Sequence, residues 1–176
     1  MSGGTGDGAR EEFFGALEAH LAEPLVSAQW FRPAGGFESA IPGLKRVLRR
    51  VFRSGDDHAA NRLAAMNVLA LTDSRLIAFS VVTGIAGLKV KKRIGEWPVD
   101  RTSVRFEELN VTSSKFAEGG NAPDTTVTSR WDIVRATLRE HGDPRELRMD
   151  FPDNPLTHEL IAAVKARRRS ASDGSA

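Results

Sequence analysis

The chain has 176 residues, enough for one domain with its own core, and 40% hydrophobic with 27% charged residues is typical of a globular protein. It has no cysteine, which excludes a disulfide framework and thiol redox chemistry. The formal net charge of +2 is too small by itself to indicate nucleic acid as a partner. There is no signal-peptide core at the N-terminus and no run long enough to span a bilayer, so we expect a cytoplasmic protein.

Both ends of the chain are poor in apolar residues. We expect disordered tails at 1–9 and 169–176 and a single domain over 10–168. Behind Asp7, a candidate helix cap, apolar residues recur at helical spacing and predict a short amphipathic helix. These residues are Phe13, Phe14, Leu17 and Leu21.

The segment that follows the first predicted strand, Leu25–Phe31, is far longer than a hairpin loop. Within this insertion, 33–66, no acidic residue occurs from Ala40 through Gly55. An apolar stripe at helical spacing consists of Leu44, Val47, Leu48, Val51 and Phe52. The cations on the other side are Lys45, Arg46, Arg49, Arg50 and Arg53. The pattern predicts a basic amphipathic helix.

Three roles remain open for this predicted helix. Its stripe can pack against the rest of the domain while the arginines face water, as most amphipathic helices of globular proteins do. It can lie in a membrane interface, where about 1 kcal/mol per cation near an anionic surface gives weak, salt-sensitive attachment. It can also meet a partner protein or a second copy of the chain.

Two short apolar runs around Thr72-Asp73-Ser74 predict a hairpin, because these side chains bond their own backbone and close a tight turn. A fourth strand is predicted over Leu88–Gly95. Alternation places three cations on one of its faces and three apolar residues on the other. The cations are Lys89, Lys91 and Arg93, and the apolar residues are Leu88, Val90 and Ile94. Exposed lysines on a strand protect against edge-to-edge aggregation, and this reading stands beside that of an anion-binding patch.

The C-terminal half predicts three more strands and a helix. Val104–Glu107 alternates with period two, and residues 110–128 read as a long polar loop. Trp131–Leu138 fits a helix or a strand; we predict a strand, because turn residues and the alternating Leu147–Phe151 follow. The last helix begins at Asn154 as N-cap with Pro155 in its first turn. Its apolar face is Leu156, Leu160, Ala163 and Val164, and its basic end is Lys165, Arg167, Arg168 and Arg169.

Two stretches of the sequence resemble bacterial pleckstrin-homology-like and GRAM-like domains. They are Leu69–Phe79, LALTDSRLIAF, and Gly95–Pro98, GEWP. The resemblance extends over most of Leu25–Arg167. It implies an α+β fold in which a seven-stranded, bent antiparallel sheet forms a partly open barrel with a C-terminal capping helix. The helix at the N-terminus and the basic helix between the first two strands are additions to that pattern. In lipid-binding members of the family, the loop between the first two strands commonly contacts headgroups, which is where the basic helix lies.

The sequence shows no pattern typical of a catalytic or metal-binding site. The histidines are scattered without metal-ligand spacing, no nucleophile elbow is present, and we expect neither a metal nor a cofactor. The chain has no tyrosine, and its other aromatic residues fall at core-like positions, which does not favour nucleic acid. Trp97 fits core packing better than ligand stacking. We therefore expect a non-enzymatic binding or scaffolding module that contacts anionic lipid headgroups peripherally. The alternative is a protein-interaction module, including a homo-oligomer, without a lipid role.

Overall fold

The computed structural model describes residues 5–35, 63–64, 66–84, 87–116 and 126–173. The elements in this part of the chain are α1 (Thr5–Glu18), β1 (Ser27–Pro33), β2 (Asn67–Leu71), β3 (Arg75–Gly84), β4 (Gly87–Pro98), β5 (Thr102–Phe116), β6 (Thr126–Glu140), β7 (Leu147–Pro152) and α4 (Pro155–Asp173). The predicted α+β class, in which seven strands are followed by a C-terminal helix, is confirmed.

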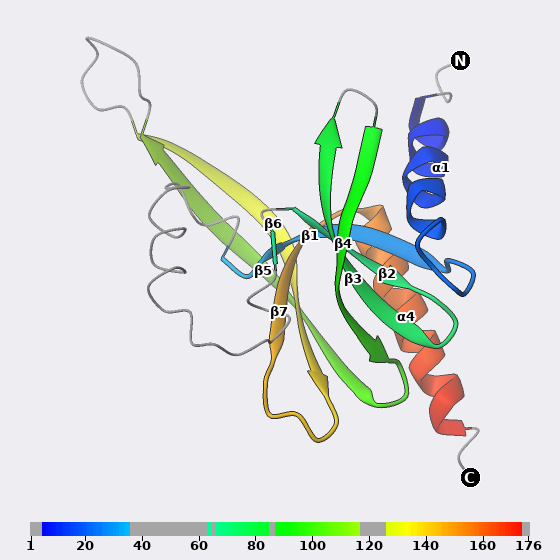
Figure 1. The fold of residues 1–176 in the computed structure, drawn as a ribbon. Coiled ribbons are helices and arrows are strands. Elements are labelled where there is room, and N and C mark those ends of the chain that lie inside the picture. The colour runs from blue at the N-terminus through cyan, green and yellow to red at the C-terminus, as the bar shows by residue number, and fades with distance from the viewer. Residues whose placement is uncertain (1–4, 36–62, 65, 85–86, 117–125, 174–176) are drawn as a thin grey trace.

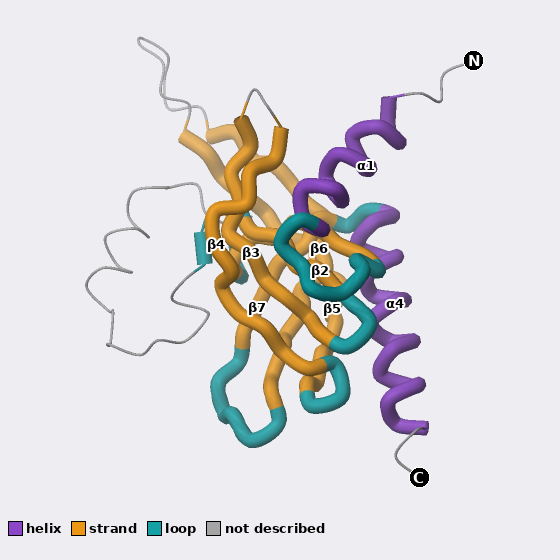
Figure 2. The backbone as a smooth tube through the Cα atoms, turned by 45° about the vertical axis from the view of Figure 1, so that its right-hand side comes forward, coloured by secondary structure: helices purple, strands orange, loops and turns teal. Residues whose placement is uncertain are grey.

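All seven strands form one antiparallel sheet in the order β4-β3-β2-β1-β7-β6-β5. β1 joins the two halves of the sheet, because Ser27–Phe31 pairs with β2 while Arg32 and Pro33 pair with β7. The sheet is strongly bent, and α4 runs along one side of it (Figures 1 and 2). In the described part of the chain, β4 and β5 are therefore the two edges of the sheet.

The main core lies on the inner face of the bent sheet, between its two halves and α4. Strand residues in this core alternate with residues of the outer face, as the period of a strand requires. They include Phe31, Leu69, Leu71, Leu76, Ala78, Ile94, Trp97, Ala136, Leu138, Leu147, Met149 and Phe151. Leu160 and Val164 of α4 pack into this core and are each 1% exposed, as the helical pattern predicted.

A second apolar layer lies on the outer face of β2 and β3, where α1 covers the sheet. Leu17 is fully buried there, and Phe13, Phe14 and Leu21 pack around it. Because β2 is covered on both faces, all five of its residues are buried. A strand with two buried faces reads as a continuous apolar run, which explains the sequence of this hairpin.

The turn between β2 and β3 is closed as predicted. The backbone N–H of Thr72 donates to the carbonyl oxygen of Arg75 at 2.9 Å, and the N–H of Arg75 donates to Thr72 Oγ1 at 3.1 Å. The threonine side chain therefore replaces a backbone acceptor inside the turn.

The start of α4 is fixed by a buried amide from β1. Asn154 Oδ1 accepts a hydrogen bond from the N–H of Thr157 at 3.0 Å, which confirms the predicted N-cap. Gln29 Nε2 donates to the same Asn154 oxygen at 2.7 Å and to Thr157 Oγ1 at 3.0 Å. Gln29 is fully buried, so these bonds satisfy an amide that would otherwise be costly to bury.

The predicted loop at 110–128 is wrong over much of its length. β5 continues to Phe116 and β6 begins at Thr126, and the two strands pair without a register shift along 102–116. Their far ends extend beyond the rest of the sheet (Figure 1). Polar residues are tolerated in this ribbon because cross-strand pairing, rather than burial, satisfies its backbone. The prediction of a strand at Trp131–Leu138 is confirmed within β6.

Both helices reach into the stretches predicted as tails. α1 begins at Thr5, so that Asp7 lies inside the helix and not in front of it, and α4 extends to Asp173. β1 ends at Pro33 and β2 begins at Asn67, so the predicted insertion, 33–66, falls between these two strands. The basic helix predicted inside that insertion lies outside the described residues.

Candidate functional site

Three basic residues of β4, Lys89, Lys91 and Arg93, are the predicted site residues that the structure describes. They are all exposed on this edge strand, and so is Lys92, which was not among the predicted residues. The other predicted site residues, those at 44–53, lie outside the described part of the chain. The candidate site therefore starts from β4.

The cations of β4 do not share one face, and this part of the prediction is wrong. Lys89 lies opposite Val82 and Arg93 lies opposite Phe79, and these two partners belong to opposite faces of β3. Two register shifts cause the difference: one leaves Lys91 without a partner on β3, and the other does so for Ile94. Each such extra residue moves the side chains that follow it to the opposite face of the sheet.

The apolar residues of β4 are divided in the same way. Leu88 and Val90 pack in the outer layer with α1, whereas Ile94 belongs to the main core. Sequence reasoning missed this division because no residue type in the KVKKRI run marks a bulge.

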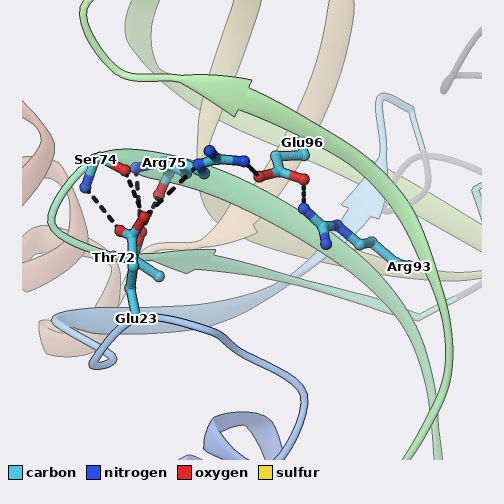
Figure 3. A network of polar contacts seen from close by, with 6 residues as sticks. All are labelled: Glu23, Thr72, Ser74, Arg75, Arg93 and Glu96. Atoms are coloured by element: carbon cyan, nitrogen blue, oxygen red, sulfur yellow. Dashed lines mark hydrogen bonds and ion pairs between the residues drawn. The ribbon is translucent and has the colours of Figure 1, made fainter.

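Arg93 takes part in a chain of polar contacts along the outer face (Figure 3). Glu96 pairs with both Arg93 and Arg75, and Arg75 Nε lies 3.7 Å from Glu23 Oε1. The charge of Arg93 is thus compensated within the fold. By contrast, Lys89, Lys91 and Lys92 have no ion-pair partner among the residues that the structure describes.

Glu23, in the linker between α1 and β1, clamps the β2–β3 turn (Figure 3). Its carboxylate accepts hydrogen bonds from Ser74 Oγ and Thr72 Oγ1, both at 2.7 Å, and from the N–H of Ser74 at 3.2 Å. The hydroxyls of Ser74 and Thr72 are the main causes that lower the pKa of Glu23 below its ordinary value of 4.5, because they stabilise the charged form. The Thr-Asp-Ser sequence of the turn is thus explained by these bonds, which attach the linker after α1 to the turn.

A buried carboxylate on the outer face of β7 was not predicted. Asp150 is fully buried, and its oxygens accept hydrogen bonds from Arg135 Nε at 2.7 Å and Arg135 Nη2 at 3.0 Å. Asp150 Oδ2 also accepts the N–H of Gly35 at 2.7 Å, where the φ of 76° suits glycine. In the sequence, Asp150 looks like one more exposed residue of an alternating strand.

These charges belong to a row that crosses four strands of the sheet. In the strand register, Arg32 of β1 lies opposite Asp150, Asp150 lies opposite Arg135, and Arg135 lies opposite Glu107 of β5. Residues directly opposite each other share one face of a sheet. The row therefore alternates in sign and ends with a glutamate on the edge strand.

The described residues contain no cluster of side chains suited to a metal ion: no group of three or more histidine, aspartate or glutamate side chains there could hold one. His158 pairs with Asp153 at 2.6 Å on the surface, and Trp97 packs in the main core, as expected for a packing role. Neither described helix has the length and apolar character needed to cross a membrane. Compared with protein-family models and with curated proteins, the chain matches none.

Proposed function

We propose that the chain is a non-enzymatic binding module of the pleckstrin-homology-like type that contacts anionic membrane surfaces. The strand order, with a C-terminal helix packed on the inner face of a bent sheet, supports the fold part of this proposal. A fold of this kind hosts many functions, so the surface chemistry must carry the rest.

One observation carries the proposal of membrane contact. Seven arginines of the described residues, including Arg93 on the same strand, are held in ion pairs, whereas three lysines gathered on one stretch of β4 have no such partner among the described residues. At about 1 kcal/mol per cation near an anionic surface, Lys89, Lys91 and Lys92 give attachment that is weak and salt-sensitive. The basic run at 44–53 adds to this charge in the sequence.

Co-sedimentation with phosphatidylserine-rich and with purely phosphatidylcholine vesicles tests the proposal. We expect the chain to sediment with the anionic vesicles alone, and to be released as salt rises. The triple variant Lys89→Glu, Lys91→Glu, Lys92→Glu should lose this binding. A second variant, Arg46→Glu, Arg49→Glu, Arg50→Glu, measures the contribution of the insertion separately.

The matched control reverses three exposed cations outside this stretch of β4: Arg101 in the turn between β4 and β5, and Lys165 and Arg169 on α4. It changes the net charge by the same amount and should retain binding. Equal loss of binding in the β4 lysine variant and in this control would show attraction by net charge alone and overturn the site. Absence of binding to anionic vesicles at low salt would overturn membrane contact, and would leave the lysines with their protective role on a sheet edge.

A further inference from the structure

The two edges of the sheet differ in regularity. β4 is interrupted by two register shifts and carries exposed cations, both of which obstruct the addition of another strand. β5 pairs with β6 over its whole length without a shift, and no other described strand covers its second edge. A regular, uncovered edge presents backbone donors and acceptors to an incoming strand.

The charge row across the sheet indicates what should lie beside β5. The row runs Arg32, Asp150, Arg135, Glu107, so the next strand would place a cation opposite Glu107. Glu107 is exposed and has no ion-pair partner in the described part of the chain. The same holds for Arg105, two residues earlier on the same face of β5.

We propose that two copies of this chain associate through their β5 edges, in antiparallel register about Phe106. A two-fold axis through Phe106 places Glu107 of one protomer opposite Arg105 of its partner, and repeats the pair on the other side of the axis. The alternating charge row then continues from one protomer into the other. The sheets of the two copies join into one, and this contact does not involve the lysines of β4.

The charges of β5 favour this register over its neighbours. A two-fold register centred on residue 105, 107 or 108 would place an arginine or a glutamate against its own copy, and like charges directly opposite are destabilising. A register centred on Phe106 opposes unlike charges twice. A strand that is complementary to itself in this way indicates a second copy, rather than an unrelated peptide, as the occupant.

Sedimentation velocity over a micromolar to millimolar concentration series tests the proposal. The unmodified chain should show a monomer–dimer equilibrium. Arg105→Glu and Glu107→Arg should each weaken the association about tenfold or more, because each creates two like-charge pairs. The double variant Arg105→Glu, Glu107→Arg should restore it, since the charges are exchanged but remain complementary.

Mixing the two single variants gives a further test. One copy then carries two glutamates and the other two arginines at these positions, so a heterodimer should form while neither variant associates alone. Arg130→Glu, an exposed cation on β6, is the matched control and should leave association unchanged. A chain that stays monomeric throughout the series overturns the proposal. So do single variants that associate like the unmodified chain, or a folded double variant that does not recover.

Discussion

The ring of Trp97 lies directly over Gly95, two residues earlier on β4. A Cβ added at Gly95 would come within 2.5 Å of the ring carbon Cη2. Trp97 is held by the main core and cannot turn away without opening it. Packing thus explains the glycine in the Gly-Glu-Trp-Pro sequence: the tryptophan ring leaves no room for a side chain at Gly95.

Gly95→Ala should therefore destabilise the fold, by about 1–3 kcal/mol, as overpacking of a core does. Urea denaturation measures this change in the free energy of unfolding. Gly15→Ala is the matched control, because nothing lies within 4 Å of a Cβ at Gly15 in α1. Alanine is favoured over glycine inside a helix by about 0.5–1 kcal/mol, so this control should be stabilising. A neutral Gly95→Ala would contradict the contact.

Truncation of Leu160 tests the attachment of α4. Its side chain is 1% exposed in the main core, so Leu160→Ala should cost about 2–5 kcal/mol through lost burial and a cavity. Lys165→Ala, an exposed position on the same helix, should stay within about 0.5 kcal/mol. If the two variants unfold at the same urea concentration, the helix does not contribute to the core as described.

The elements predicted correctly from the sequence are those whose burial repeats with a clear period. β7 alternates because Leu147, Met149 and Phe151 enter the core, and α4 was found from its cap and its apolar face. The outer half of the β5–β6 ribbon was missed because its backbone pairing leaves no apolar period in the residues.

The site was harder to predict, because its geometry depends on residues far apart in the sequence. The cations of β4 were found, but the bulges that distribute them over two faces leave no sign in residue type. Asp150 is buried through contacts with β6 and with Gly35, which the alternation of β7 alone does not reveal. Long-range register, rather than local pattern, created both features.

Acid should weaken the clamp that Glu23 forms on the β2–β3 turn. The hydroxyls of Ser74 and Thr72 lower its pKa in the folded state below the ordinary value of 4.5. A lowered folded-state pKa stabilises the fold above the unfolded-state value, and this contribution is lost as pH falls through the folded-state value. Glu23→Gln should therefore unfold more easily than the unmodified chain near neutral pH, and the difference should shrink below 4.5.

Urea denaturation of both proteins at a series of pH values measures that difference. Ser74→Ala removes the largest cause of the shift, so it should reduce the same pH-dependent contribution. A difference between Glu23→Gln and the unmodified chain that stays constant down to the acid end would contradict the clamp.

Removal of the buried charge at Asp150 should be more costly than any surface change on the same sheet. Asp150→Asn keeps the shape of the side chain and an acceptor for Gly35, but removes the buried negative charge that pairs with Arg135. Breaking a buried ion pair costs about 3–5 kcal/mol, and we expect the lower end because Arg135 is 24% exposed. Asp132→Asn, which alters an exposed carboxylate bonded to Asn110 on the same ribbon, should change stability by less than about 0.5 kcal/mol. Equal effects of the two variants in urea denaturation would mean that the charge row does not hold β7 to β6.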